Sequence, residues 1–227
     1  EPFLGLSQGL GAVLIVTVFV QIFWFFGIHG PNVLAPVLEG IWGQAQLINI
    51  DIFQKGYEGK TGTAAVLAAI DDGKAYMWVR GSFDAFAWFG GSGGTIVLII
   101  AILLFSKRAD YLTVGKLSLG PGIFNINEPI MFGLPVVLNP IMFIPFVIAP
   151  LVATTIGWVA TYLGLVAPVS QQVAWVTPPL LLSFLATGAD WRAPIVALVC
   201  MVVTFLIWTP FVIAANKMDP ALGESEQ

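Results

Sequence analysis

Four long stretches without a charged residue constrain this chain more than any other feature of its sequence. They run from Pro2 to Leu38, Ala85 to Ser106, Pro129 to Ala189 and Ala193 to Asn216, and together they hold 144 of the 227 residues. A helix needs about 20 largely apolar residues to cross the hydrocarbon core of a bilayer, so each stretch is long enough to cross at least once. Only 10% of the residues are charged, against roughly 25% in soluble proteins. We therefore predict an integral membrane protein and exclude a free-standing soluble domain.

Charge and cysteine usage exclude further classes of protein. The formal net charge is −4, and the sequence has no basic cluster of the kind that neutralises a phosphate backbone, so we do not expect nucleic acid as a partner. Cys200 is the only cysteine, which rules out an intrachain disulfide and predicts a buried, inert thiol. With a single histidine and no cysteine partner, the usual ligand set for a metal is missing. We expect neither a metal nor a cofactor.

The apolar stretches predict helices separated by clear interruptions. The segment Gly27 to Asn32 breaks the first helix, because its glycines and proline suit a turn. Asp51 to Asp84 holds nine charges and predicts the main aqueous loop, with a short helix at Thr61 to Ile70. The predicted transmembrane helices are Leu4 to Phe26, Ala85 to Ser106, Leu134 to Leu165 and Ala193 to Ala215.

Two further stretches are apolar but too broken to face lipid. Gly120 to Gly133 and Pro168 to Gly188 both contain prolines, glycines and side-chain amides. Non-helical backbone at membrane depth is tolerated only where it is buried in protein or lines a cavity, and paired broken segments of this kind point to a binding site in transporters. The predicted fold class is an all-α polytopic membrane protein with transmembrane helices and two re-entrant hairpin segments. The basic loop around Lys107 to Lys116 predicts a cytoplasmic side for the first hairpin.

Glu128 and His29 are the strongest candidates for chemistry. Glu128 opens the longest charge-free run, and an ionisable group inside the membrane is by default a functional-site hypothesis; the alternative is a carboxylate that only solvates a helix end. His29 is the only histidine and lies between Gly27 and Gly30, which would let the backbone approach a ligand closely. Its alternative is a satisfied packing residue.

Amides and tryptophans near these residues suit a ligand rich in hydroxyl groups. Asn125 and Asn127 add donors and acceptors beside Glu128 on a broken backbone. Trp175, in the second broken stretch, and Trp24, before His29, are candidate platforms for the C–H face of a sugar ring. The competing interpretation of both indoles is anchoring at the membrane interface.

The run GIFNINEPIMFGLP from Gly122 to Pro135, followed by Leu138-Asn139-Pro140, resembles a family signature. It is similar to the enzyme IIC permeases of the bacterial phosphoenolpyruvate-dependent sugar phosphotransferase system, in the lactose/cellobiose/diacetylchitobiose branch. The segment WFFGIHG from Trp24 to Gly30 resembles the same branch. The chain starts with Glu1 and resembles the C-terminal half of such a permease. We therefore expect residues 1–217 to be the C-terminal sugar-binding and transport domain of a longer permease, and residues 218–227 to be a polar cytoplasmic tail.

The resemblance implies a function and its partners. It implies transport of a β-linked disaccharide such as cellobiose or diacetylchitobiose, or of lactose, across the bacterial inner membrane, with a likely homodimer in the lipid bilayer written here only as what the family implies. Phosphate would come from a phosphocysteine on a phosphorylated enzyme IIB, so no donor cysteine is expected in this chain. The implied sugar ligands are His29, Glu128, Asn127, Asn125, Asn139 and Trp175.

The sequence leaves three questions open. Either Glu128 or His29 could remove the proton from the hydroxyl that accepts phosphate. A proton-coupled secondary sugar transporter, with Glu128 and His29 as a proton relay, is the alternative function. A membrane subunit that transports nothing, with the broken segments as packing features, is the second rival.

Overall fold

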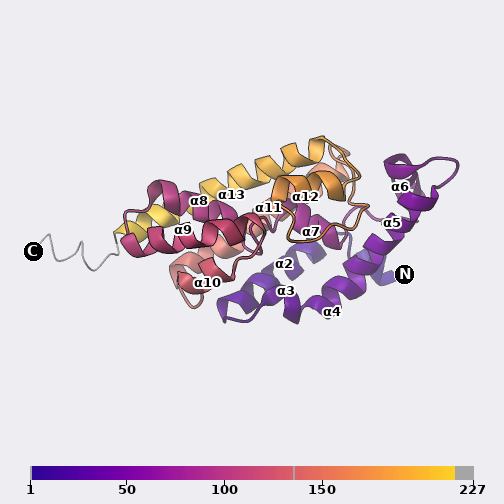
Figure 1. The fold of residues 1–227 in the computed structure, drawn as a ribbon. Coiled ribbons are helices and arrows are strands. Elements are labelled where there is room, and N and C mark those ends of the chain that lie inside the picture. The colour runs from indigo at the N-terminus through magenta and orange to yellow at the C-terminus, as the bar shows by residue number, and fades with distance from the viewer. Residues whose placement is uncertain (1, 135, 218–227) are drawn as a thin grey trace, which may run out of the picture.

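The computed structural model describes residues 2–134 and 136–217, and throughout these residues the regular structure is helical. The predicted polar tail, residues 218–227, lies outside the described residues. Figure 1 shows a long bundle with a small lobe at one end. The helices are α1 (Pro2–Leu6), α2 (Leu10–Phe25), α3 (Gly30–Val33), α4 (Ala35–Val37), the π-helical segment η1 (Leu38–Gly43), α5 (Gln44–Lys55), α6 (Gly62–Asp71), α7 (Arg80–Phe86), α8 (Thr95–Phe105), α9 (Ala109–Ile123), α10 (Glu128–Gly133), α11 (Pro140–Tyr162), α12 (Pro179–Ala186) and α13 (Arg192–Asn216).

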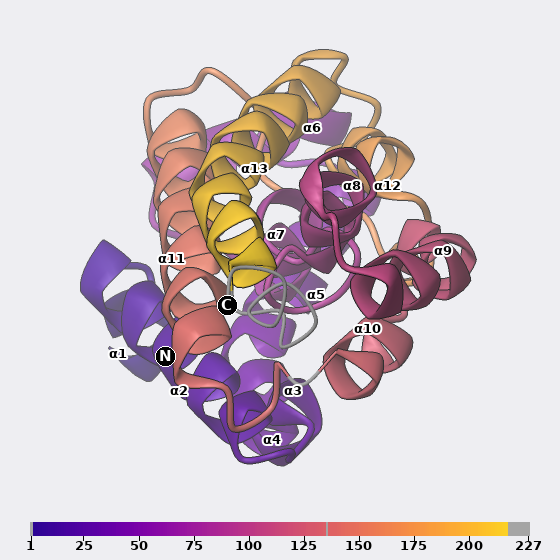
Figure 2. The same ribbon diagram turned by 90° about the vertical axis from the view of Figure 1, so that its left-hand side faces the viewer.

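Two helices have the length and composition of membrane spans. Helix α11 has 23 residues and α13 has 25, so at 1.5 Å per residue each is at least about 34 Å long, enough for the hydrocarbon core of a bilayer. They pack along each other, with α8 beside α13 and α2 beside α11 (Figure 2). Within the described part of the chain, only these two helices are both long and apolar enough to span. The helices predicted at 134–165 and 193–215 are confirmed.

The first predicted span is divided in two. Residues 7–9 separate α1 from α2, which leaves α2 with 16 residues. At this break the Ser7 hydroxyl donates to the carbonyl of Leu4 at 2.7 Å, and the side-chain oxygen of Gln8 accepts a hydrogen bond from the backbone N–H of Trp78 at 2.8 Å. These polar side chains end α1 and tie the break to a segment 70 residues away. The prediction of one continuous helix from Leu4 to Phe26 is therefore wrong at its N-terminal end.

The span predicted at 85–106 is also wrong for its first ten residues. The helix α8 begins only at Thr95 and has 11 residues. Before it, residues 87–94 form a buried loop in which Gly90, Gly91, Gly93 and Gly94 all have positive φ. A Cβ at Gly93 would overlap the Phe146 ring at 2.2 Å, so this glycine is needed both for its backbone angle and for space.

The two broken stretches lie next to each other in the fold. The helix α9 runs through Pro121 to Ile123, a turn at residues 124–127 follows, and α10 packs back on α9. In the second stretch an irregular segment, residues 163–178, precedes α12. The Asn125 side chain joins the two stretches by hydrogen bonds to the carbonyls of Trp175 and Thr177. That these stretches enter the membrane as re-entrant hairpins stays a prediction.

The charged segment forms the lobe at one end of the bundle (Figure 1). Helices α5 and α6 pack on each other around a small core of their own, which contains Val66, Ala69 and Ala75. The helix predicted at 61–70 is confirmed as α6. The predicted aqueous loop is nevertheless too long at its end, because Arg80 and Asp84 belong to α7, whose residues Phe83 and Phe86 are buried in the main core.

Candidate functional site

The turn after α2 positions His29. Gly27 has a φ of 77°, which ends α2, and His29 is the N-cap of the short helix α3. Its Nδ1 accepts a hydrogen bond from the backbone N–H of Asn32 at 3.3 Å. In a neutral imidazole the nitrogen that accepts carries no proton, so this contact places the proton on Nε2. The rest of the ring lies on Trp24, with the ring centroids 4.6 Å apart.

Glu128 approaches His29 from the other side of the chain's topology. It is the first residue of α10, after the N-cap Asn127 and before Pro129. Its Oε1 lies 3.7 Å from Nε2 of His29, and the two side chains are 46% and 36% exposed. The two residues that the sequence singled out for chemistry, 99 positions apart, therefore face each other with their polar atoms open to solvent or ligand.

The glycine loop, residues 87–94, forms the floor beside this pair. Its backbone groups are bound by side chains from distant elements, as non-helical backbone in a membrane protein requires. The Asn125 oxygen accepts from the Gly90 N–H at 2.7 Å, and the Asn127 amide donates to the Ser92 carbonyl at 3.0 Å. From α13, Trp208 Nε1 donates to the Gly93 carbonyl at 3.2 Å. The loop is thus fixed in place by side chains of other segments.

These elements enclose a cavity of about 310 Å³, which we call the first cavity. That volume is at the lower end of the range of small-molecule sites, about 300–1,000 Å³. Five of the six predicted ligands line it: His29, Glu128, Asn125, Asn127 and Trp175. Its wall also contains residues that the sequence did not single out: Pro31, Asn32, Arg80, Asp84, Trp88, Gly91 and Ser92.

Three predicted residues have duties that the sequence did not show. Both amide protons of Asn125 are donated to the Trp175 and Thr177 carbonyls, at 2.6 and 2.8 Å, so it holds the cavity wall together, and only its oxygen has capacity left. Asn139 is the N-cap of α11, accepting from the N–H groups of Ile141 and Met142, and it does not line the cavity. Trp24 is 1% exposed and supports His29 from behind.

Arg80 and Asp84 are the main residues that sequence reasoning missed. Arg80 Nη1 donates to Asp84 Oδ2 at 2.8 Å, and Arg80 Nε donates to Glu39 Oε1 at 3.0 Å, with both Arg80 and Asp84 about one-fifth exposed. The guanidinium also lies over the Trp88 ring, 4.9 Å from its centroid. The signal was present as an Arg and an Asp four residues apart, next to a charge-free run, a spacing that pairs side chains on one face of a helix.

A comparison with known proteins identifies the family. The family model described as "Phosphotransferase system, EIIC" matches residues 2–150. The chain belongs to the phosphotransferase system EIIC family. Confirmation of the family also supports the resemblance seen in the Asn-Glu-Pro run and in the segment from Trp24 to Gly30.

Relatives in this EIIC family cover the chain almost completely. It is 58% identical over 225 residues to the cellobiose-specific EIIC component of Lactococcus lactis subsp. lactis (strain IL1403), a match that covers 96% of this chain and 46% of the relative. It is 36% identical to the oligo-beta-mannoside-specific EIIC component of Bacillus subtilis (strain 168), covering 100% of the chain and 48% of the relative. The chain spans about half the length of the curated EIIC relatives it matches.

A solved EIIC structure has the same fold. The crystal structure of the transporter ChbC, the IIC component of an N,N'-diacetylchitobiose-specific phosphotransferase system, superposes with a TM-score of 0.87 at 33% identity. The match covers 99% of this chain and 49% of ChbC. The all-helical architecture described above is therefore the EIIC architecture.

Proposed function

We propose that this chain is the sugar-binding half of an EIIC permease for a β-linked disaccharide. The substrate class is cellobiose or diacetylchitobiose, with lactose as a further member, and the site of action is the bacterial inner membrane. Support comes from EIIC membership, from the specificities named for the relatives, and from a cavity lined by a carboxylate, amides and indole rings. In the complete permease these residues would work in a homodimer surrounded by lipid, together with phosphorylated enzyme IIB.

The observation that carries the proposal is the pair of His29 and Glu128. Their 3.7 Å separation is longer than a hydrogen bond, so neither side chain consumes the other's polar atoms. A sugar hydroxyl beside both would accept from Nε2 of His29 and donate to a carboxylate oxygen of Glu128. Both contacts fall within the usual reach of acid–base groups, about 2.6–3.2 Å.

The hydrogen bonding of His29 assigns the two roles. Because Nδ1 accepts from Asn32, Nε2 carries a proton and serves as a donor to the hydroxyl oxygen. Glu128 is then the base. In the transfer step the hydroxyl oxygen forms a bond to phosphorus, the sulfur–phosphorus bond of the enzyme IIB phosphocysteine breaks, the thiolate leaves, and the hydroxyl proton passes to Glu128.

The test compares wild-type full-length permease with Glu128→Gln, using radiolabelled cellobiose and diacetylchitobiose with and without phosphorylated enzyme IIB. We expect sugar phosphate only with the phosphorylated partner, and a fall in its formation of about 100-fold or more in Glu128→Gln, the usual size of a general-base contribution. Glu58→Gln, an exposed carboxylate in the lobe, is the matched control and should retain full activity.

Two results would contradict the proposal at different points. Full phosphorylation by Glu128→Gln, with only weaker sugar binding, would remove Glu128 from the role of base. Accumulation of unmodified sugar without enzyme IIB, abolished by an uncoupler, would instead establish a proton-coupled carrier.

A further inference from the structure

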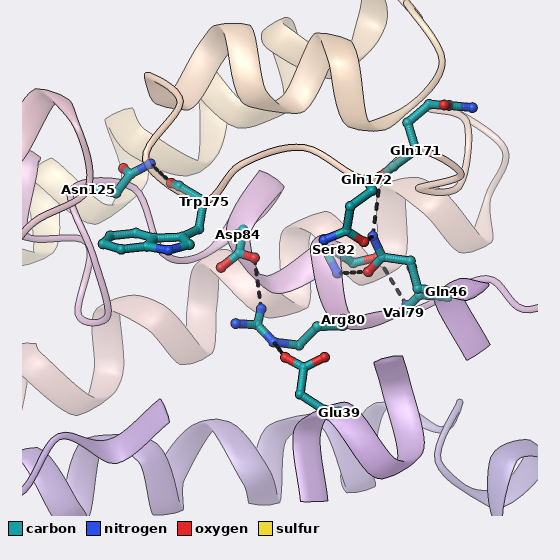
Figure 3. A network of polar contacts seen from close by, with 11 residues as sticks. Glu39, Gln46, Val79, Arg80, Ser82, Asp84, Asn125, Gln171, Gln172 and Trp175 are labelled. Carbon is teal, nitrogen blue, oxygen red and sulfur yellow. Dashed lines mark hydrogen bonds and ion pairs between the residues drawn. The ribbon is translucent and has the colours of Figure 1, made fainter. Parts of the chain in front are cut away.

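A second cavity adjoins the first and shares one wall with it. It has a volume of about 300 Å³, and Arg80, Asp84 and Trp175 line both cavities. Figure 3 shows Arg80 between Glu39 and Asp84 at this shared wall. Each cavity alone is at the lower limit of volume for small-molecule sites, and the two together are about twice that size.

The second cavity has polar groups with hydrogen-bonding capacity left. Gln46 holds Gln172 in place, because Gln46 Nε2 donates to Gln172 Oε1 at 3.2 Å, while Gln46 Oε1 accepts from the Gly81 N–H at 2.6 Å. Among the described residues, nothing accepts from the Gln172 amide nitrogen. The same is true of Nη2 of Arg80, whose Nε and Nη1 are already paired.

Glu39 adds an acceptor on the opposite side. Its Oε1 accepts from Arg80, and its Oε2 lies over Gly43, where a Cβ would come within 2.7 Å of it. Its side chain is 61% exposed. A cavity with a carboxylate, a guanidinium and a side-chain amide on its walls would be a costly place for a lipid acyl chain, but it suits a ligand with many hydroxyl groups.

Trp175 connects the two cavities. Its side chain is 55% exposed and its backbone is fixed by the Asn125 amide at 2.6 Å, so a rigid indole surface passes from one cavity to the other. Aromatic faces pack against the apolar faces of ligands while polar groups around them fix orientation.

We propose that one saccharide spans both cavities. The ring that receives phosphate lies in the first cavity at His29 and Glu128, and the adjoining ring passes over Trp175 into the second cavity. There Gln172, Arg80 and Glu39 bind its hydroxyls. The second cavity is thus the subsite that distinguishes a disaccharide from a simple β-glucoside. This inference rests on the proposed function, because it takes a sugar in the first cavity as given.

The experiment measures binding of cellobiose and of methyl β-D-glucoside to the purified full-length permease by titration calorimetry. Leu47→Trp places bulk at the lining of the second cavity from an exposed position, and Gln172→Ala removes one donor. The control is Leu67→Trp, an exposed leucine on α6 that lines neither cavity. Thermal unfolding of each variant verifies that it is folded.

We expect wild type to bind cellobiose at least 10-fold more tightly than methyl β-D-glucoside. Leu47→Trp should remove most of that advantage, and Gln172→Ala should weaken cellobiose binding by roughly 2- to 10-fold, the value of one hydrogen bond, while the glucoside is bound as before. Equal affinity for both sugars in wild type, or unchanged cellobiose binding by both cavity variants, would overturn the inference and leave the proposed function standing. Binding of neither sugar by wild type would overturn the proposed function itself.

Discussion

Replacing Asn125 with alanine should damage the site more than any removal of a presumed sugar ligand beside it, because this side chain joins three segments. The substitution takes away an acceptor from the Gly90 N–H and a donor from each of the Trp175 and Thr177 carbonyls. The bond to Gly90 is fully buried, while the other two are partly buried. Asn125 also has a φ of 63°, a conformation that asparagine tolerates better than alanine.

The size of the effect follows from these contacts. A buried N–H without a partner costs about 1–3 kcal/mol, and each partly buried bond contributes about 0.5–1.5 kcal/mol, so the sum is roughly 2–6 kcal/mol. For a chain of this length, 1 kcal/mol corresponds to about 2–4 °C in Tm, so we expect Asn125→Ala to lower Tm by roughly 10 °C. Saccharide binding should be lost with it, because the two broken stretches separate.

The assay is thermal unfolding of the purified full-length permease, with cellobiose binding measured on the same sample. Asn125→Asp is the informative companion, since it keeps the acceptor for Gly90 but directs an oxygen at two carbonyls. It should therefore be destabilised too. A Tm within about 1 °C of wild type for both variants, with full binding, would refute the clamp that we infer for Asn125.

Three further predictions concern other residues. Gly91→Ala should abolish saccharide binding, because its Cβ would lie 2.7 Å from Cγ of Asn127 and its φ is 95°; calorimetry that finds normal affinity would contradict this. Asn139→Ala removes the N-cap of α11 and should cost about 1 kcal/mol in a thermal melt while saccharide affinity is retained, so a selective loss of affinity would restore Asn139 as a ligand. Hydrogen bonds from the Arg108 guanidinium lower the pKa of Asp110 in the loop before α9, so its stabilising effect is present at neutral pH and is lost as pH falls through that lowered pKa. Asp110→Asn should abolish this part of the acid destabilisation, below about 1 kcal/mol for so exposed a pair, and an unchanged difference in Tm between pH 7 and pH 3 would refute it.

The sequence predicted the long helices well because their hydropathy has no rival interpretation. Both α11 and α13 come from unbroken apolar runs, and the prolines inside them do not end either helix. The run from Ala85 to Ser106 is equally free of charge, yet half of it is a buried glycine loop. Hydropathy measures only whether a segment avoids water, and it gives no information on whether lipid or protein surrounds the segment.

The candidate site was predictable in its members but not in its arrangement. His29 and Glu128 stood out because polar groups are rare and expensive in apolar sequence. That argument cannot assign partners, so it did not separate Asn125, whose amide is used by the backbone, from a free ligand, nor Asn139, which caps a helix. Arg80 was assigned to the aqueous loop because neighbouring charges in sequence obscured its burial in the fold.

The fastening of the glycine loop has a consequence for the order in which the protein is made. One of its carbonyls is bound by Trp208 from α13, 115 residues further along the chain, and others are bound from the turn at residues 124–127. A ribosome therefore releases the loop long before its anchors exist. During synthesis the loop must wait unfastened until the last helix has been inserted, so the sugar site is completed at the end of translation and not helix by helix.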